Sequence, residues 1–205
     1  MMITDERKSH WENVYSTKQP HEVSWTQEVP TTSLNLIRSF AIDKSAGIID
    51  IGGGDSNLVD FLLDEGYTNI SVLDISVEAL ERAKKRLGAK ADSVKWRESD
   101  ITEFKPTEQY AVWHDRAAFH FLTTPEQIAN YVDTAAKAVT GYLAIGTFSE
   151  NGPKRCSGLD ITQYNEEKLE STFSAGFEKI ECLTEDHTTP FNTTQNFIFC
   201  SFKKR

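Results

Sequence analysis

The chain has few cysteines and no long apolar run. Its three cysteines, Cys156, Cys182 and Cys200, are odd in number and form no CxxC pair, which argues against a disulfide framework and a structural zinc site. We therefore expect reduced thiols and no metal site. No segment approaches the roughly 20 apolar residues of a membrane-spanning helix, so the sequence predicts a soluble protein.

The chain also lacks an excess of basic residues and an N-terminal apolar segment typical of a secretion signal. Its net charge of -9 repels phosphate groups, so we expect neither a nucleic-acid nor a membrane partner. A cytoplasmic location follows as the expectation. A length of 205 residues suits one domain, and we predict a single domain over 1–205.

Short apolar runs alternate with helical periodicity through the middle of the chain. The expected strands cover 47–51, 70–74, 94–98, 110–115 and 142–148, and helical segments at 56–66, 76–88 and 124–139 lie between them. Ser76 is the expected N-cap of the second of these helices, and Gly88 the residue that ends it. This alternation is typical of an α/β fold with a parallel sheet covered by helices on both faces.

The last two expected strands, 178–187 and 196–204, follow each other without a helix and indicate an antiparallel hairpin that closes the sheet. The sequence thus predicts a Rossmann-like, doubly wound, seven-stranded and mostly parallel sheet with an antiparallel C-terminal hairpin strand. Two further helical segments, 10–17 and 31–40, precede the first strand. We expect 1–45 to form a helical flank or lid on an α/β core at 46–205.

A glycine-rich turn, Gly52, Gly53 and Gly54, follows the first expected strand and opens into a helix. Such a turn brings backbone N–H groups and the positive end of the helix dipole close to a ligand. The dinucleotide fingerprint needs a glycine at the position of Asn57, and the Lys of a phosphate-binding P-loop is absent. The turn therefore predicts a ligand site, with a nicotinamide dinucleotide disfavoured.

The segment Ile49–Gly54 resembles the first motif of the class I S-adenosylmethionine-dependent methyltransferases, although Ser56 stands where a third glycine is frequent. The resemblance implies that Asp50 holds the ammonium group of S-adenosylmethionine, next to the three glycines. A carboxylate at Asp74, followed by Ile75, ends the next strand and is able to accept both ribose hydroxyls, as it also does in NAD-binding proteins.

The end of the third strand completes this resemblance. Asp100 corresponds to the family position that accepts from the adenine amino group, and Ile101 to the apolar residue that packs on the ring. An alternative reading is that Asp100 caps a turn with Thr102. Three acidic residues at the ends of successive strands favour an amino-acid nucleoside over a diphosphate.

The acceptor site should lie after the fourth strand, at residues 113–122. This segment resembles the D-R/K-G element of thiopurine-type S-methyltransferases and related protein-lysine methyltransferases, with Ala117 where glycine is usual. Those families also carry a W-x-x-x-Y element, which Trp11 and Tyr15 match. The resemblance implies that Tyr15 and Trp25 close over the donor.

We expect His114 or His120 to accept the proton of the acceptor, because imidazole titrates near neutral pH. Asp115 is expected to orient Arg116 or to contact the methionine end of the donor. The alternatives are an internal ion pair between Asp115 and Arg116, and a structural role for His120. A loop at 151–159, rich in turn residues, is a candidate rim of the acceptor site.

Together these features predict S-adenosylmethionine-dependent methyl transfer to a small-molecule or protein acceptor by in-line displacement. S-adenosylmethionine is the expected cofactor, and no metal is expected. The alternative is a non-catalytic nucleoside-binding sensor or partner subunit with the same fold. An NAD-dependent oxidoreductase is disfavoured by Asn57 and Asp50.

Overall fold

The computed structural model describes residues 4–205, and seven of the strands in this part of the chain form one sheet. The strands are β1 (Ile48–Ile51), β2 (Ile70–Asp74), β3 (Val94–Glu98), β4 (Tyr110–Arg116), β5 (Val139–Phe148), β8 (Phe177–Thr188) and β9 (Thr194–Lys204). They lie in the order β3-β2-β1-β4-β5-β9-β8, and β9 runs antiparallel to both of its neighbours. The predicted fold class is confirmed.

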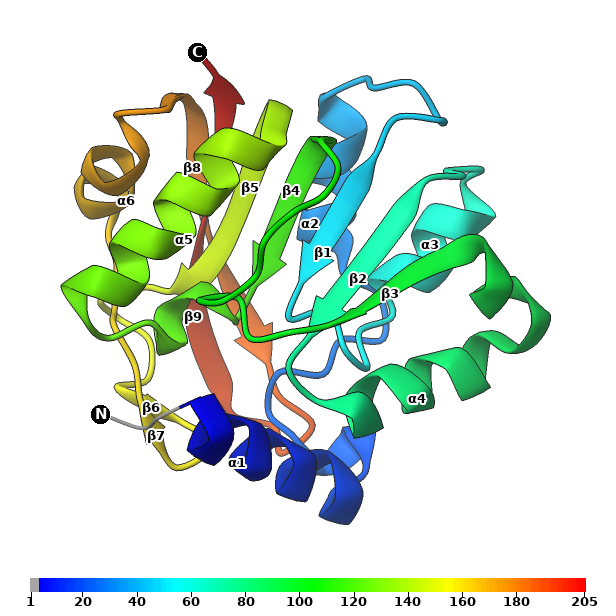
Figure 1. Ribbon diagram of the computed structural model, residues 1–205. Coiled ribbons are helices and arrows are strands. Elements are labelled where there is room, and N and C mark those ends of the chain that lie inside the picture. Colours follow the sequence, from blue (N-terminus) through cyan, green and yellow to red (C-terminus); the bar gives the residue numbers. More distant parts are fainter. Residues whose placement is uncertain (1–3) are drawn as a thin grey trace.

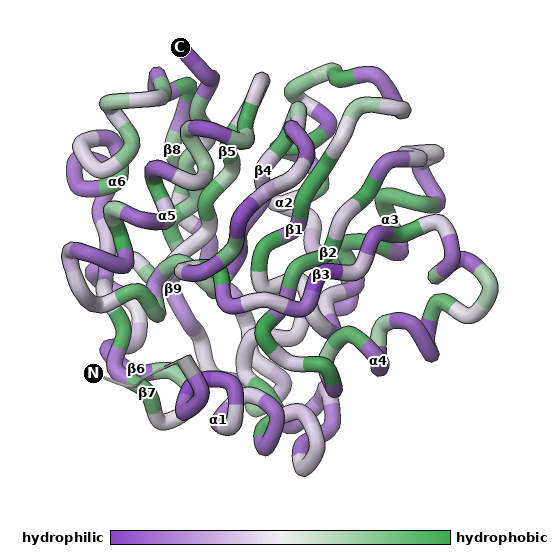
Figure 2. The backbone as a smooth tube through the Cα atoms, viewed as in Figure 1, coloured by the Kyte–Doolittle hydropathy of each residue, from purple (hydrophilic) through white to green (hydrophobic). Residues whose placement is uncertain are grey.

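Helices cover both faces of the sheet (Figure 1). Helices α2 (Thr31–Ser39), α3 (Leu58–Asp64) and α4 (Val77–Leu87) pack on one face, and α5 (Pro125–Ala138) and α6 (Glu166–Phe173) on the other. Helix α6, between β5 and β8, is not among the helices expected from the sequence. Figure 2 shows apolar residues gathered along the central strands and polar residues on the outer turns of the helices.

The two faces can be followed along a single strand, because successive strand residues point in opposite directions. In β1, Ile48 packs with α2, α3 and α4, whereas Ile49 packs with α5 and α6. In β4, Val112 and Trp113 divide in the same way. This alternation decides which helix each polar residue at the strand ends meets.

Local capping explains where helix α4 begins and ends. The Ser76 hydroxyl accepts a hydrogen bond from the backbone N–H of Ala79 at 3.2 Å, which satisfies one of the free donors of the first turn. Gly88 ends the helix with a φ of 57°, a conformation that favours glycine. Both predicted boundary residues are confirmed.

Helix α1 (Thr4–Thr17) runs across the carboxyl ends of the strands (Figure 1). Glu12 on this helix accepts hydrogen bonds from Ser76 Oγ at 2.8 Å, Val77 N at 2.8 Å and Glu78 N at 3.1 Å. A carboxylate at the N-terminus of α4 is stabilised by the free N–H groups and the helix dipole. Through Glu12, α1 is fastened to the edge of the sheet at which the glycine turn lies.

The cysteines correct one expectation from the sequence. Cys182 on β8 and Cys200 on β9 form a disulfide, while Cys156 is a free, buried thiol. The hairpin register places Cys182 directly opposite Cys200, with a Cα–Cα distance of 4.1 Å. The expectation of three reduced thiols is therefore wrong, because sequence spacing does not reveal cross-strand register.

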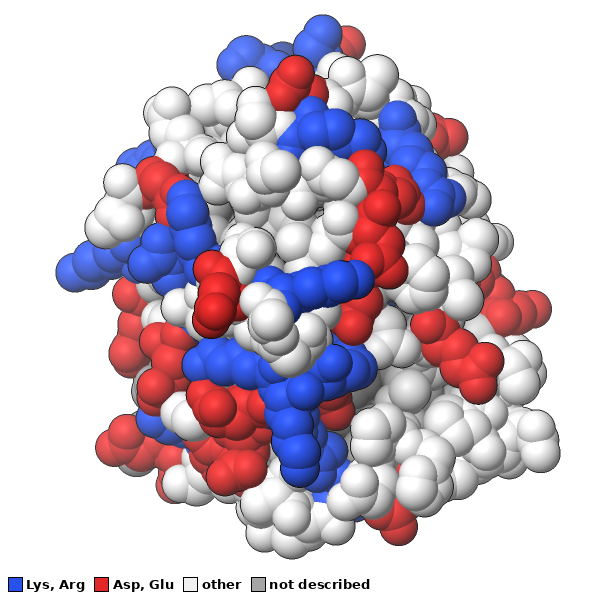
Figure 3. Space-filling model, turned by 90° about the vertical axis from the view of Figure 1, so that its right-hand side faces the viewer, with Lys and Arg blue, Asp and Glu red and all other residues white. Residues whose placement is uncertain are grey.

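Charged groups are mixed on the surface formed by α3 and α4. Figure 3 shows basic and acidic side chains interleaved on this side of the molecule. Arg86 of α4, for example, pairs with Asp55 at 2.5 Å and with Asp60 at 2.9 Å. Within residues 4–205, no helix is long and apolar enough to cross a bilayer.

Candidate functional site

The glycine turn after β1 brings backbone close to two carboxylates. Gly52 has a φ of +65°, and a Cβ there would lie 2.6 Å from the Cβ of Ala118, so a side chain does not fit. A Cβ on Gly54 would lie 2.5 Å from Asp74 Oδ2. The turn therefore needs glycine to let the chain pass directly against Asp74, the acidic residue that ends β2.

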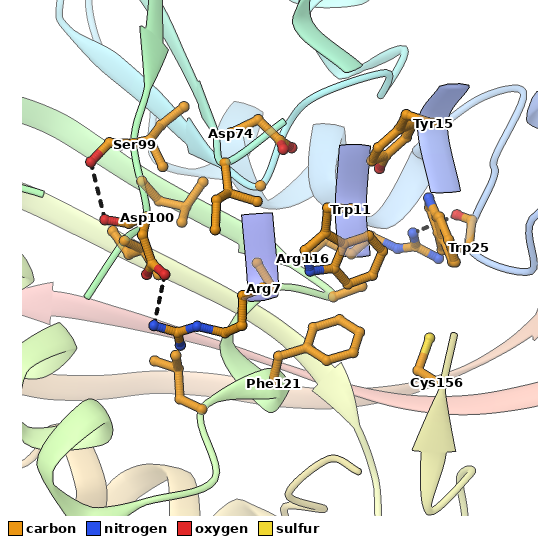
Figure 4. Close-up of a pocket in the computed structure, with 18 residues that line it drawn as sticks. Arg7, Trp11, Tyr15, Trp25, Asp74, Ser99, Asp100, Arg116, Phe121 and Cys156 are labelled. Atoms are coloured by element: carbon orange, nitrogen blue, oxygen red, sulfur yellow. Dashed lines mark hydrogen bonds and ion pairs between the residues drawn. The ribbon is translucent and has the colours of Figure 1, made fainter. Parts of the chain in front are cut away.

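A pocket opens between this turn and α1. Strands β1, β2 and β4 contribute lining residues from their carboxyl ends, α1 covers one side, and Cys156 lies at the far end (Figure 4). In doubly wound folds ligands bind at this edge, where the strand order reverses between β1 and β4. Of the expected donor-binding residues, the following line it: Tyr15, Trp25, Gly52, Asp74, Ile75, Asp100 and Ile101.

Asp74 is a buried carboxyl at the wall of the pocket, 5% exposed. It accepts a hydrogen bond from Ser76 N at 2.8 Å. Burial raises the pKa of Asp74 to about 7, and the nearby negative charge of Asp50 adds to this rise. A buried carboxylate with few hydrogen-bond partners is costly to ionise. Hydroxyl groups of a ligand would offset this cost by donating hydrogen bonds to it.

Asp100 shows the turn-capping contact that the sequence left open. Its Oδ1 accepts from Thr102 N at 2.9 Å and from Thr102 Oγ1 at 2.7 Å, and Arg7 Nη2 lies 2.7 Å from Oδ2. The residue still lines the pocket, beside Ser99 and Ile101. Asp100 is therefore held by protein groups on both oxygens, and any contact with adenine would have to be shared with them.

Arg7 is a pocket residue that sequence reasoning missed. A signal for it exists, since Arg7, Trp11 and Tyr15 are spaced four residues apart and so share one face of α1. In Figure 4 these three side chains extend along one side of the pocket. The predicted W-x-x-x-Y element is thus part of a longer helical stripe.

An aromatic wall closes the pocket below α1. The ring centroid of Trp11 lies 5.0 Å from that of Phe121 and 5.7 Å from that of Trp25, both in edge-to-face contact. Tyr15 adds a further edge-to-face contact with Trp25 at 6.3 Å. Such a wall favours flat, apolar ligand groups.

Arg116, at the end of β4, is a buried cation with free hydrogen-bonding capacity. Its Nη1 donates to the Trp25 carbonyl at 2.9 Å, and its guanidinium lies 4.7 Å from the Phe197 ring. Nε and Nη2 are buried and have no hydrogen-bond partner among the described residues. Burial lowers the pKa of Arg116 to about 10, so it remains charged near neutral pH. Two free donors on a buried cation indicate an anionic ligand group.

Asp115 does not face the pocket, although the sequence suggested catalytic and donor-binding roles for it. The side chain is fully buried on the α5 side of the sheet, where it accepts from Ala118 N at 3.1 Å, Phe119 N at 3.0 Å and Tyr131 Oη at 2.8 Å. These contacts occupy the carboxylate, so the geometry supports neither role. They also replace the internal ion pair with Arg116 that was the alternative.

His120 is also turned away from the pocket. It is fully buried, stacks on Phe148 at 4.4 Å, and its Nδ1 accepts from Phe148 N at 3.3 Å. Burial and the charge of Arg116 lower the pKa of His120 to about 3, which leaves the ring neutral. The geometry favours the structural alternative over the proton acceptor predicted for His120.

A second cavity adjoins the first and shares four lining residues with it: Tyr15, Trp25, Gly52 and Arg116. Asp50, Gly53 and His114 line this second cavity, whereas Gly54 lines neither. His114 Nδ1 lies 2.7 Å from Asp50 Oδ1. Two of the expected residues thus meet each other beneath the glycine turn.

No group of three or more metal-ligating side chains is present in the part of the chain that the structure describes. The free thiol of Cys156 has its pKa raised to about 11 by burial, so it stays protonated.

Comparison with known proteins agrees with this architecture. Residues 48–141 match the model of a methyltransferase domain family, while a comparison with curated proteins finds no match. An S-adenosylmethionine-dependent methyltransferase from Anabaena variabilis is similar in structure, with a TM-score of 0.76 and 15% identity over 100% of this chain and 96% of that one.

Two further solved structures are similar. One, described by the conversion of a disulfide bond into a thioacetal group during echinomycin biosynthesis, has a TM-score of 0.77 and 15% identity over 96% of this chain and 92% of that one. The other is 1,6-didemethyltoxoflavin-N1-methyltransferase from Burkholderia thailandensis with its bound substrate and S-adenosylhomocysteine, at a TM-score of 0.69 and 14% identity over 100% of this chain and 91% of that one.

Residues 48–141 thus match a methyltransferase domain, and the fold of the chain is the one seen in S-adenosylmethionine-dependent methyltransferases. The methyltransferase-domain match and the S-adenosylhomocysteine bound in the Burkholderia structure support S-adenosylmethionine as the cofactor. The thiopurine-type or protein-lysine subtype suggested by the motifs stays a prediction.

Proposed function

We propose that the protein transfers a methyl group from S-adenosylmethionine to a small, flat acceptor molecule held against the aromatic wall. The observation that carries this proposal is the pocket under α1, which joins Asp74, the glycine turn and the orphaned guanidinium of Arg116 in one cavity. A small molecule is favoured over a protein side chain because α1 lies across the pocket and Trp11 and Trp25 close its acceptor side.

The lining groups fit the chemical parts of the proposed donor. Asp74 would accept from the ribose hydroxyls, and Ile75 and Ile101 would pack on the adenine. At the opposite end, Arg116 offers free N–H donors to the methionine carboxylate, and Asp50 offers a negative charge to its ammonium group. Asp50 and Arg116 both line the second cavity, and this pair of an anion and a cation suits a zwitterion.

When bound, S-adenosylmethionine supplies a methyl group on a positively charged sulfur, which an acceptor lone pair attacks in line. The chain's own contribution is to hold the reactants in this line and to keep water away with aromatic rings. Cys156 lines the pocket but stays a protonated thiol, and His120 lies outside the pocket. Neither is therefore placed to take a proton from the acceptor. The acceptor should therefore arrive with a free lone pair, as an amine or a thiolate does.

Calorimetric titration with S-adenosylhomocysteine tests the donor site. We expect binding in the micromolar range, and the absence of binding at millimolar ligand would contradict the proposal. Incubation with methyl-labelled donor and a lysate separated by size tests the acceptor. Label in the low-molecular-weight fraction is expected, whereas label confined to protein would assign the protein acceptor that the sequence left open.

The cytoplasmic location expected from the sequence also remains a proposal. The Cys182–Cys200 disulfide weighs against it, because reducing compartments disfavour structural disulfides.

A further inference from the structure

Three buried polar side chains form an unbroken hydrogen-bonded chain beneath the glycine turn. Asp50 Oδ1 lies 2.7 Å from His114 Nδ1, and His114 Nε2 lies 2.8 Å from Ser33 Oγ. The residues come from β1, β4 and α2, and each is at most 3% exposed. Polar groups are costly to bury unless they are paired. The three side chains satisfy one another by hydrogen bonding within an otherwise apolar layer.

The strand register produces this meeting. Asp50 and His114 are direct neighbours across the parallel pair of β1 and β4, and both point to the sheet face that α2 covers. Ser33 lies in the first turn of α2, facing the sheet. Three separate elements thus deliver one polar group each to the same point.

The chemistry of the three groups determines which of them donates and which accepts each hydrogen bond. An ionised carboxylate only accepts hydrogen bonds, so His114 must donate its Nδ1–H to Asp50. In the neutral ring Nε2 then accepts, and the Ser33 hydroxyl donates to it. This arrangement fixes the orientation of the Asp50 side chain through Oδ1.

The second oxygen of Asp50 lies directly under the turn. A Cβ placed on Gly53 would be 2.4 Å from Asp50 Oδ2, so the absence of a side chain there leaves room for this oxygen. Asp50, Ser33 and His114 all line the second cavity, as does Arg116 with its free donors. The three hydrogen-bonded side chains therefore hold the Asp50 carboxylate at this cavity. The guanidinium of Arg116, which has N–H donors left unpaired within residues 4–205, lines the same cavity.

We propose that His114 and Ser33 are positioning residues that hold the Asp50 carboxylate toward the ammonium group of the donor. This inference rests on the proposed function, and it replaces the proton-acceptor role that the sequence suggested for His114. Both ring nitrogens of His114 are taken by Asp50 and Ser33, so the ring acts on the ligand through Asp50.

Two ligands separate this role from a general effect on folding. S-adenosylhomocysteine carries the amino-acid end, whereas 5′-methylthioadenosine has the same nucleoside and lacks it. His114→Leu removes the N–H donor to Asp50 and should weaken S-adenosylhomocysteine binding by roughly 10- to 30-fold, the usual range for a charge-assisted hydrogen bond. Binding of 5′-methylthioadenosine should change by less than about twofold, since that ligand makes no contact with Asp50.

Conservative variants sharpen the test. His114→Asn places an amide N–H near the position of Nδ1 and should restore most of the affinity for S-adenosylhomocysteine. Ser33→Ala should weaken it by about threefold, because one indirect hydrogen bond is lost, and Ser33→Thr should restore it. These smaller changes carry the test if His114→Leu does not fold, as judged by its circular dichroism and thermal melting.

The outcomes are distinct. A selective loss of S-adenosylhomocysteine binding with rescue by His114→Asn supports the inference. Equal losses for both ligands, or unchanged binding of both in folded variants, would overturn it while leaving the proposed function intact. Wild-type protein that binds neither ligand would overturn the proposed function and this inference together.

Discussion

The strands on the two sides of the β1–β4 switch both carry titratable residues at their carboxyl ends, yet they use them differently. Asp74, which ends β2, and Asp100, which follows β3, line the pocket. Asp115 and His120, which end β4 and follow it, are fully buried in contact with the protein itself. Position at the end of a strand thus predicts proximity to a ligand, while the direction of the side chain decides whether it reaches one.

The difference arises from alternation along β4. His114 points to the α2 side, where it meets Asp50, and Asp115 points to the α5 side, where it meets Tyr131. The acidic residues at the ends of β2 and β3 line the pocket, whereas Asp115 on β4 supports the loop that follows this strand. The following variants test this division, beginning with the largest expected effect.

Asp115→Ala should lower the free energy of unfolding by about 3 kcal/mol, because it leaves three hydrogen-bond donors, two of them buried, without an acceptor. Urea denaturation followed by tryptophan fluorescence measures this loss. Asp115→Asn, which keeps an acceptor oxygen, is the matched control and should lose less than half as much. A stable Asp115→Ala variant that binds S-adenosylhomocysteine poorly would place Asp115 in the site after all.

Asp74→Ala should weaken ligand binding and leave the free energy of unfolding largely unchanged. We expect S-adenosylhomocysteine affinity to fall by about 2 kcal/mol, roughly 30-fold, through loss of charge-assisted hydrogen bonds from the ribose. Calorimetric titration gives the affinity, and Glu81→Ala, an exposed change on α4, serves as the control. Equal affinities of wild type and Asp74→Ala would remove Asp74 from the site.

The pH dependence of donor binding should report the raised pKa of Asp74. Because hydroxyl groups donate to the ionised carboxylate, binding should weaken as the pH falls through the pKa of about 7. At pH 6 about one tenth of the carboxyls are ionised, so the affinity for S-adenosylhomocysteine should be roughly tenfold weaker than at pH 8. Asp74→Asn should flatten this profile, and a slope that persists in the variant would assign it to another group.

His120→Asn should have the smallest effect on activity. Its amide oxygen is able to accept from Phe148 N in place of the ring Nδ1, and the side chain does not reach the pocket. Methyl-transfer rates with labelled donor should stay within about twofold of wild type. A loss of kcat by a hundredfold, with KM and thermal stability unchanged, would restore His120 as a proton acceptor.

The fold and several residues that line the pocket were largely predictable from the sequence. The glycine turn and Asp74 occur in local motifs with a fixed relation to the strands, and β2 and β3 begin and end at the predicted residues. The family resemblance also predicted that Tyr15 and Trp25 close over the donor, and both line the pocket.

The remaining features depend on contacts between distant segments. The Cys182–Cys200 pair follows from hairpin register, and the meeting of Ser33 with His114 joins residues 81 positions apart. The two unpaired N–H groups of Arg116 result from the absence of an acceptor among the described side chains packed around it, which only the folded structure shows. The burial of Asp115 could have been predicted from the sequence, because side chains alternate between the two faces of the sheet along β4.

One residue of the loop after β4 links backbone geometry to the shape of the pocket. Ala117 has a φ of 67°, a left-handed conformation that costs a non-glycine residue on the order of 1 kcal/mol. Its methyl group forms part of the pocket lining. Glycine at this position would relieve the strain and enlarge the cavity by one methyl group. The alanine therefore narrows the pocket at a small expense in folding stability.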